Sequence, residues 1–469
     1  MSETEISKGE LLQKLKIQKS AFLSEGHVSE KTRIDRIDRS INLLKENEKK
    51  LVEAMAADFG HRAHQQSKLA DIDGSIGPLE NAKKNLKKWM KPERRSVTFP
   101  LGLFGARGRI EYQPLGVVGC ISPWNFPVNL VFSPLAGVFS AGNRAMVKPS
   151  EYTPATSQLI KELVEQAYSS EEVVVILGGP ETGRAFAELP FDHLLYTGSG
   201  SVAKHIMRSA AENLVPLTLE LGGKSPVIIG RSADLETAAN NIMAGKTMNA
   251  GQICLAPDYV FLPEGGKEEF LEHAKNSVSD MFPNLKDNPD YTSVINKSHF
   301  DRLNELVSDA KEKGAEVVEL NPADEDFSQQ ENFRIPPTLI FNPKEEMKVM
   351  QDEIFGPILP VKEYDQLEDT ISYVNSKDRP LGLYYFGSNQ AEQRKVLDET
   401  TSGGVTINDV IMHVAQEDLP FGGVGPSGMG AYHGQEGFRT FSHTKSIYTQ
   451  SGIVSKLAKA MRPPYKKPA

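Results

Sequence analysis

Cysteine and tryptophan are scarce in this chain of 469 residues, where each of the two occurs only twice. With Cys120 and Cys254 alone, a disulfide framework and a metal site built from four thiolates are both excluded. Only His61 and His64 lie close together among the histidines, and a charged helix surface explains that pair as well as a ligand pair would. We therefore expect no structural or catalytic metal ion.

The chain also lacks an excess of positive charge and any long apolar run. Lys and Arg number 53 against 62 Asp and Glu, so binding to nucleic acid or to a membrane surface is disfavoured. Residues 1–16 contain no apolar signal core, and no apolar run approaches the roughly 18 residues that could span a membrane. We expect a cytoplasmic protein whose partner is a small molecule.

Length and hydrophobic pattern predict more than one domain, because a chain this long exceeds what one core usually serves. Apolar residues recur at helical spacing through residues 1–95. Short alternating runs around glycines follow at 96–115 and favour a hairpin that stands apart from the main body. From Gly116 onward, buried strands and amphipathic helices alternate, which indicates an α/β protein with doubly wound parallel sheets.

A glycine-rich turn is the first candidate functional segment. Gly198-Ser199-Gly200-Ser201-Val202-Ala203 follows a predicted strand and opens a helix, so it matches the fingerprint that brings backbone N–H groups to a pyrophosphate. Glu220 follows at the spacing of about 20 residues where that fingerprint places a ribose-binding carboxylate. Taken literally, Glu220 is a cofactor ligand, and a tight turn that binds nothing remains an equal alternative.

The thiol of Cys254 is the second candidate. It lies in a polar segment with glycine, residues 251–257, between a predicted helix and a predicted strand, where a functional side chain is well placed. A small buried apolar residue is the alternative for a lone cysteine, and it remains open on this segment alone. Cys120 lies inside an apolar run, residues 117–121, and fits the protein core better.

The third candidate segment, residues 122–127, reads Ser-Pro-Trp-Asn-Phe-Pro. It follows the end of a predicted strand, at the sheet edge where open α/β sheets bind ligands. Asn125 offers an amide donor that could face a developing oxyanion. Asparagine beside proline is equally a common turn residue, so this segment is weak evidence when it stands alone.

Further motifs decide between these interpretations. They are Leu-Glu-Leu-Gly-Gly-Lys at 219–224, Lys-Pro-Ser-Glu at 148–151, Glu-Ile-Phe-Gly-Pro at 353–357 and Leu-Pro-Phe-Gly-Gly-Val-Gly-Pro-Ser-Gly at 419–428. Combined with the three segments above, they resemble the aldehyde dehydrogenase superfamily in order and spacing over nearly the whole chain. The resemblance implies two Rossmann-like domains with a small β oligomerisation arm, and NAD-dependent oxidation of an aldehyde to a carboxylic acid.

The resemblance also implies a role for each catalytic candidate. Cys254 attacks the aldehyde to form a thiohemiacetal and then a thioester, while the Asn125 amide and the Cys254 backbone N–H hold the oxyanion. Under this resemblance, Glu220 is the general base that activates water and is no longer expected to be a ribose ligand. A cysteine-dependent esterase or hydrolase is the alternative from a different class, but it would not need the cofactor residues; a CoA-acylating dehydrogenase would not need Glu220.

Cofactor binding is likewise assigned by resemblance. Lys148 and Glu151 bind the adenine ribose, Glu353 binds the nicotinamide ribose, and Phe355 packs nearby. The remaining expected cofactor-binding residues are Ser122, Trp124, Ser150, Gly198, Ser199 and Leu221. NAD is favoured because the Glu151 carboxylate would repel a 2′-phosphate, although some family members with the same Lys-Pro-Ser-Glu segment also accept NADP.

The same resemblance gives the domain organisation. Residues 1–95 with 116–219 are expected to form the NAD-binding domain, and 220–415 the catalytic domain. Residues 96–115 with 428–452 are expected to form the oligomerisation arm of a homodimer, followed by a peripheral tail at 453–469.

Within the superfamily, the chain is most similar to the class 3-like branch. Asp-Ile-Asp-Gly-Ser-Ile at 71–76, Lys-Lys-Trp-Met at 87–90 and the arm segment 105–112 look most like bacterial coniferyl aldehyde dehydrogenases. An aromatic substrate such as coniferyl aldehyde is therefore expected, with medium- or long-chain aliphatic aldehydes as the alternative in the same branch.

Overall fold

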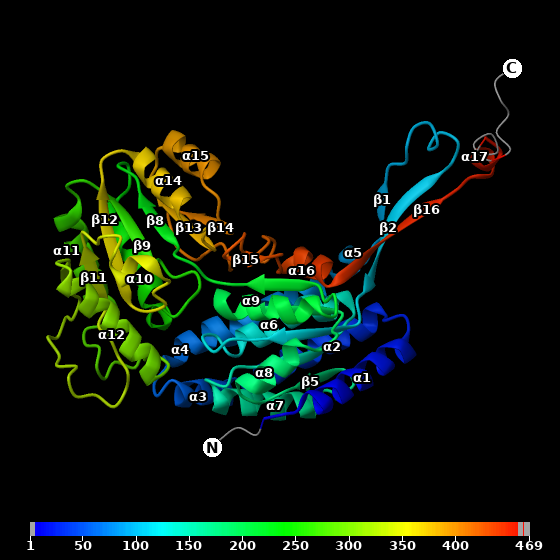
Figure 1. The fold of residues 1–469 in the computed structure, drawn as a ribbon, viewed down its shortest axis with the longest axis horizontal. Coiled ribbons are helices and arrows are strands. Elements are labelled where there is room, and N and C mark those ends of the chain that lie inside the picture. Colours follow the sequence, from blue (N-terminus) through cyan, green and yellow to red (C-terminus); the bar gives the residue numbers. More distant parts are fainter. Residues whose placement is uncertain (1–4, 458–462, 464–469) are drawn as a thin grey trace.

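Two lobes and a projecting arm make up the computed structural model, which describes residues 5–457 and residue 463 (Figure 1). Each part is built on one β-sheet, of six, seven and three strands. The two larger sheets are almost entirely parallel and the smallest is antiparallel, which confirms the predicted fold class. Across the described residues, no helix is both long enough and apolar enough to cross a membrane.

The first lobe contains the six-stranded sheet, in the order β15-β7-β6-β3-β4-β5, in which only β15 is antiparallel to its neighbour. Its strands are β3 (Val117–Ile121), β4 (Arg144–Lys148), β5 (Val173–Val175), β6 (His193–Thr197), β7 (Leu217–Glu220) and β15 (Gly428–Met429). The central strands are short apolar runs that are buried on both faces, as parallel strands are when helices cover them.

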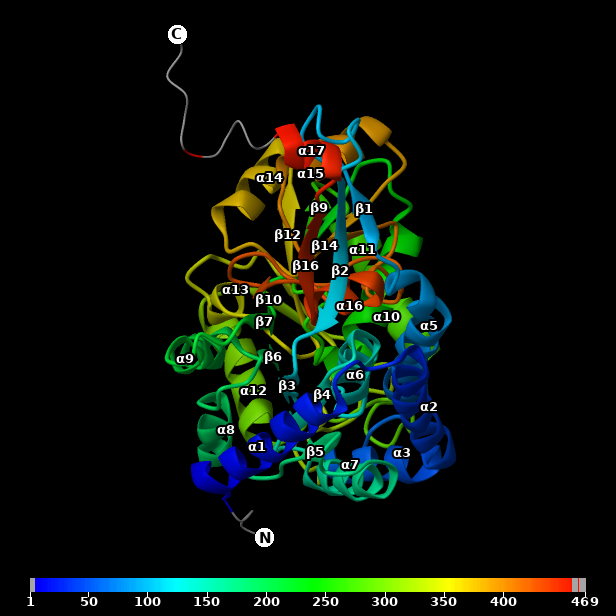
Figure 2. The same cartoon turned by 90° about the vertical axis from the view of Figure 1, so that its right-hand side faces the viewer.

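Helices cover both faces of this sheet (Figure 2). One face is covered by α1 (Lys8–Glu25), α8 (Pro180–Ala187) and α9 (Gly200–Ala211). The other face is covered by α2 (Glu30–Glu46), α5 (Gly74–Trp89), α6 (Asn129–Ala141) and α7 (Pro154–Ala167). Between α2 and α5 the chain forms α3 (Glu48–Asp58), α4 (His64–Ser67) and a π-helical turn (Lys68–Asp73).

A buried ion pair fixes the start of α6, which follows the segment 122–127. Asp71, in the π-helical turn, pairs with Arg62 at 2.7 Å, and both side chains are inaccessible to solvent. The second carboxylate oxygen of Asp71 accepts hydrogen bonds from the backbone N–H groups of Val128 and Asn129, at 3.0 and 3.1 Å. The first turn of α6 is thereby capped from a different part of the chain.

The second lobe contains the seven-stranded sheet, in the order β10-β11-β12-β9-β8-β13-β14. Its strands are β8 (Pro226–Ile229), β9 (Tyr259–Pro263), β10 (Glu316–Glu319), β11 (Thr338–Phe341), β12 (Ile358–Tyr364), β13 (Gly382–Phe386) and β14 (Gly404–Ile407). One face packs against α10 (Leu235–Thr247) and α11 (Lys267–Met281). The other packs against α12 (Lys297–Glu312), α13 (Lys348–Gln351), α14 (Leu367–Ser376) and α15 (Gln390–Glu399).

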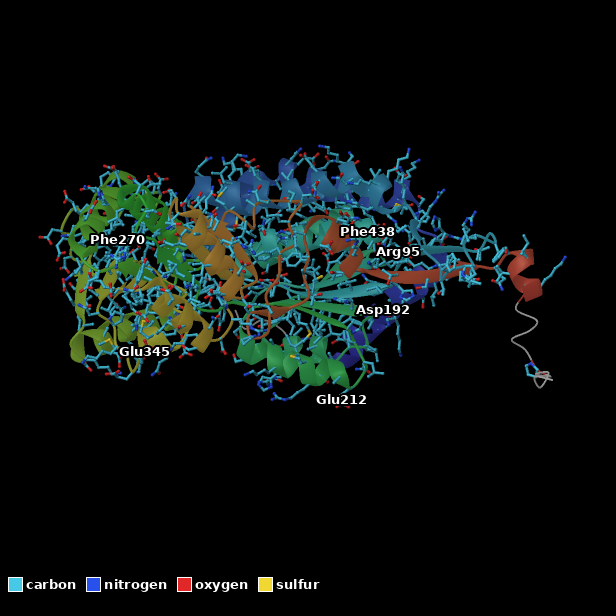
Figure 3. All side chains as sticks on the ribbon, turned by 90° about the horizontal axis from the view of Figure 1, so that it is seen from above. Arg95, Asp192, Glu212, Phe270, Glu345 and Phe438 are labelled. Carbon is cyan, nitrogen blue, oxygen red and sulfur yellow. The ribbon has the colours of Figure 1, made fainter. Side chains whose placement is uncertain are left out.

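The arm consists of β1 (Glu93–Arg95), β2 (Arg107–Pro114) and β16 (Ser442–Thr449), and it extends away from both lobes (Figure 1). At its base, the ring of Phe438 lies 5.2 Å from that of Tyr112 and 6.0 Å from that of Trp89. Figure 3 shows Arg95 on the arm and Phe438 at the base.

The arm differs from the predicted one at both segments: β1 lies at 93–95, before the expected start at residue 96, and the second segment was expected to begin at residue 428. Strand β15 instead pairs with β7 in the first lobe, and α16 (Gly434–Thr440) packs on α6. Only the β16 portion therefore belongs to the arm, because the backbone before it completes the six-stranded sheet. Of the expected tail, 453–457 lie in α17 (Gly452–Leu457), while 458–462 and 464–469 lie outside the described residues.

Candidate active site

The candidate residues of the first lobe gather at one edge of its sheet. Ser122 follows β3, Lys148 ends β4, Gly198 follows β6 and Glu220 ends β7. The strands are parallel, and their register aligns the carboxyl ends of β4, β3, β6 and β7 in that order. This is the edge at which open α/β sheets bind ligands, so segments far apart in the sequence meet at one site.

The backbone of Glu220 is held from both sides. The Gly198 N–H donates to the Glu220 carbonyl at 3.0 Å, and Gly428 of β15 lies opposite Glu220 in the antiparallel register. The Glu220 side chain is 2% exposed, and neither carboxyl oxygen has a hydrogen-bond partner among the described residues. Burial alone raises its pKa well above the usual range.

Cys254 follows a short 3-10 turn, Met248–Gly251, with a strained backbone. Asn249 and Ala250 in this turn have φ values of 50° and 51°, in the left-handed region. The Gln252 side-chain amide donates to the Asn249 carbonyl at 2.9 Å, which closes the turn. The half-buried thiol is thus presented by a loop of defined shape rather than by a flexible segment.

Asn125 is bound directly to the loop that contains the thiol. Its side-chain amide nitrogen donates to the Gln252 carbonyl at 3.1 Å, and the Asn249 amide donates to the Asn125 carbonyl at 3.0 Å. A primary amide has two N–H groups, so one N–H of Asn125 remains for a further acceptor. The structure therefore brings together Asn125 and Cys254, which the sequence nominated separately.

The electrostatic environment of the thiol is unfavourable for a thiolate. Burial raises the pKa of Cys254 well above the usual range, and the charges of Glu220 and Glu353 raise it further. Tyr432 lies in the same electrostatic environment, because burial and the charges of Glu220 and Cys254 raise the pKa of its phenol. Sequence reasoning missed Tyr432, although it follows the recognised motif 419–428 by four residues.

Glu353 packs directly on the backbone of the Glu220 segment. A Cβ added at Gly222 would lie 2.3 Å from both Glu353 carboxyl oxygens, so only glycine permits this contact. Burial, followed by the charge of Asp258, raises the pKa of Glu353 to about 8. One of its buried carboxyl oxygens has no partner among the described residues, which leaves an acceptor for a polar ligand.

Phe355 and Trp124 meet across the two lobes. Their ring centroids lie 5.4 Å apart in an edge-on arrangement, and Trp124 also lies 5.1 Å from the ring of His299. Phe355 has a φ of 50°, a strained value for a residue with a side chain. The predicted cofactor residues of the second lobe therefore reach those of the first.

A buried lysine, Lys246 of α10, is a second feature that sequence reasoning missed. It is fully buried, its amine has no hydrogen-bond partner among the described residues, and burial lowers its pKa to about 8. Nearby, Lys224 pairs with Asp258 and donates to the Val349 and Asp352 carbonyls at 2.9 and 3.0 Å. The sequence did contain a signal for Lys246, since it is a lysine within an otherwise apolar stretch of a predicted helix.

At the far end of the edge, Lys148 and Glu151 form an ion pair of 2.9 Å, and Lys148 is almost completely buried. Four of the other predicted cofactor residues have backbone partners. Ser122 donates to the Leu130 carbonyl, Ser150 accepts from the Tyr152 N–H, Ser199 accepts from the Val202 N–H, and the Leu221 N–H donates to the Ser427 carbonyl.

Two features near this edge suit the groups of a dinucleotide. Ser199 is the N-cap of α9, and the space beside Gly200 is open, with no atom within 4 Å of a Cβ added there. The start of this helix is therefore available to a pyrophosphate. Lys148 with Glu151, and separately the Glu353 oxygen that has no partner among the described residues, offer polar groups to which ribose hydroxyls can bind.

The family model described as "Aldehyde dehydrogenase family" matches residues 5–447. The chain belongs to the aldehyde dehydrogenase family, whose members oxidise aldehydes to acids and bind NAD or NADP. This match confirms the family resemblance that the motifs indicated.

Particular relatives refine the comparison. The chain is 58% identical to a probable coniferyl aldehyde dehydrogenase of Caulobacter vibrioides, over 96% of this chain and 93% of the relative. It is 52% identical to the coniferyl aldehyde dehydrogenase of a Pseudomonas species, over 95% and 92%. Its fold matches a substrate-bound Staphylococcus aureus aldehyde dehydrogenase with a TM-score of 0.89 and 34% identity, over 96% and 99% of the two chains.

Proposed function

We propose that this protein oxidises coniferyl aldehyde, or a closely related aromatic aldehyde, to the carboxylic acid with NAD. The relatives at 58% and 52% identity support this substrate class. The observation that carries the proposed chemistry is the meeting of Cys254, Asn125 and Glu220 at one sheet edge, although they come from three distant segments.

In the first step, the Cys254 sulfur attacks the aldehyde carbon. The remaining Asn125 N–H and the backbone N–H of Cys254 then stabilise the oxyanion of the thiohemiacetal, and each donor lowers the barrier by about 3 kcal/mol. The hydrogen bond from Asn125 to the Gln252 carbonyl supports this role because it holds the amide next to the thiol loop. Medium- and long-chain aliphatic aldehydes undergo the same step, so they remain the alternative substrates.

The NAD cofactor, when bound, supplies a hydride acceptor and a positive charge that favours the thiolate. Loss of a hydride from the thiohemiacetal carbon to that acceptor would leave a thioester on Cys254. Glu220 then takes a proton from water, the water oxygen attacks the thioester carbonyl, and the C–S bond breaks to release the acid and the Cys254 thiolate. The buried carboxyl of Glu220, which has no hydrogen-bond partner among the described residues, supports this role.

The binding assignments belong to the same proposal. Lys148 and Glu151 hold the adenine ribose, Glu353 holds the nicotinamide ribose, and Phe355 lines that end of the site. The start of α9 at Gly198 and Ser199 holds the pyrophosphate. Ser122, Trp124, Ser150 and Leu221 complete the cofactor site. NAD is preferred over NADP because a 2′-phosphate would meet the Glu151 carboxylate.

The decisive assay mixes the protein, NAD and coniferyl aldehyde, and follows the absorbance of reduced nicotinamide with and without CoA. We expect CoA-independent turnover that is lost in Cys254→Ala, while NAD binding is retained. Cys120→Ala is the matched control: this thiol is buried in the core, and burial raises its pKa to about 12, so its removal should leave turnover intact. Unimpaired turnover in Cys254→Ala would end the proposed mechanism, and hydrolysis of esters without NAD would favour the esterase alternative.

A homodimer and its domain roles complete the proposal. The first lobe serves as the NAD-binding domain and the second as the catalytic domain. Strand β16 lies at the edge of the arm sheet, with mostly exposed side chains and one unpaired side, so it can add to a partner's sheet. Sedimentation should give a dimer at micromolar concentration, and a monomer would contradict this assembly.

A further inference from the structure

A segment at the start of the described chain crosses the first turn of α8. One carboxylate oxygen of Glu5 accepts hydrogen bonds from the Thr182 backbone N–H at 2.7 Å and from the Thr182 hydroxyl. The Ile6 N–H donates to the same hydroxyl at 2.8 Å. Glu5 thus caps a helix that lies more than 170 residues further along the chain.

The capped turn is also in contact with Lys148. A Cβ added at Gly183 would lie 3.5 Å from Cε of Lys148, so the lysine stem packs on the residue that follows Thr182. A Cβ at Gly179 would lie 2.7 Å from the other Glu5 oxygen, so glycine is required for this approach of the carboxylate. Glu151 pairs with Lys148, and Glu5 lies against the same turn that the Lys148 stem contacts.

Glu5 is negatively charged at neutral pH. The hydrogen bonds from Thr182, together with the positive charge of Lys148, hold the pKa of Glu5 below its usual range. A helix start attracts anions through its free N–H groups, and here Glu5 already accepts a hydrogen bond from the Thr182 N–H in the first turn of α8. An additional phosphate at this place would meet a negative charge and lose that donor.

We propose that Glu5 is a specificity-determining residue that, with Glu151, excludes the 2′-phosphate of NADP from the surroundings of Lys148. This inference rests on the proposed function, which assigns the adenine ribose to Lys148 and Glu151. Glu5 acts through charge and through the capped helix start. Its effect should therefore appear only with nucleotides that have a 2′-phosphate.

The test is equilibrium binding of 5′-AMP and of 2′,5′-ADP to the full chain, measured by calorimetry. Glu5→Gln keeps the size of the side chain and removes its charge. We expect this variant to bind 2′,5′-ADP about fivefold or more tightly than the original chain does, with the affinity for 5′-AMP unchanged. Added salt should reduce the difference between the two proteins because it screens exposed charges.

Glu10→Gln is the matched control. Glu10 is exposed in the same segment and caps α1 through Ser7, which glutamine can still do. Removal of this charge should leave the affinities for both nucleotides unchanged. An equal increase in affinity for 2′,5′-ADP in both variants would show that the change in net charge is the cause, and it would overturn the proposal.

Lys148→Ala separates this inference from the proposed function. If it weakens 5′-AMP binding while Glu5→Gln leaves the ratio of the two affinities unchanged, only the role of Glu5 is wrong. If Lys148→Ala leaves 5′-AMP binding unchanged, the ribose assignment itself is wrong, and the role of Glu5 is wrong with it.

Discussion

Asp71 and Glu220 are two buried carboxyl groups in the same lobe with opposite surroundings. Asp71 pairs with Arg62 and accepts two backbone hydrogen bonds at the start of α6. Glu220, at the end of β7, has no hydrogen-bond partner among the described residues. The first arrangement fixes the backbone that follows residues 122–127, whereas the second leaves a carboxyl free to exchange a proton.

The two carboxyl groups differ in the interactions that oppose the effect of burial on their pKa. Burial raises the pKa of both acids, but Arg62 and two N–H groups act in the opposite direction on Asp71, and nothing does so on Glu220. An unpartnered buried acid lowers stability and is therefore a candidate functional group. A buried acid that has hydrogen-bond or ion-pair partners is a candidate structural group. Four predictions test this distinction between functional and structural acids.

Glu220→Gln should have the largest effect, a loss of steady-state turnover by about 10²–10⁴-fold, because water is no longer activated. The first turnover should persist, so rapid mixing should show a burst of reduced nicotinamide followed by a slow phase. The free energy of unfolding should not fall, since no hydrogen bond is lost. Normal turnover in this variant would assign the proton transfer to another group.

Asp71→Asn should lower the free energy of unfolding by about 3–5 kcal/mol, because the Arg62 charge stays buried without its partner. Urea denaturation measures this change. Asp73→Asn is the control: Asp73 is an exposed neighbour in the same π-helical turn, and its substitution should change stability by less than about 0.5 kcal/mol. Equal effects of the two substitutions would show that the buried pair does not stabilise the fold.

The pH dependence of turnover should reveal the raised pKa of Glu220. A protonated carboxyl cannot accept the proton of water, so activity is present above this pKa and falls about tenfold per pH unit below it. Where hydrolysis limits the rate, the midpoint should lie above the ordinary glutamate value of 4.5. Glu220→Gln should lack this acidic limb; if the limb persists, another group causes it.

Glu172→Gln should have the smallest effect, a loss of about 1–2 kcal/mol in the free energy of unfolding at pH 7. Burial raises the pKa of Glu172, but hydrogen bonds from Arg39 and Arg36 outweigh it and lower the pKa to about 2. The stabilisation is therefore present above pH 4.5 and is lost as the pH falls towards 2. The difference between the two proteins should shrink at pH 3, and a constant difference would exclude the ionic origin.

Much of this architecture could be predicted from local pattern. The apolar strands and amphipathic helices appear where their periodicity placed them, because burial selects those spacings. The boundary of the arm could not be predicted, since strand β15 has two residues and its place depends on pairing with the distant β7. Tyr432 and Lys246 were missed for a similar reason, because each gains its significance from neighbours on other elements.

Residue identity and spacing along the chain were enough to establish the family, the order of the motifs and the nomination of Cys254, Glu220 and Asn125. The folded chain alone shows that Asp71 is paired, that Glu220 has no hydrogen-bond partner among the described residues, and that Glu5 lies against the turn that Lys148 contacts. Burial and pairing arise between segments that are distant in the sequence. No local pattern records which partner a buried charge meets.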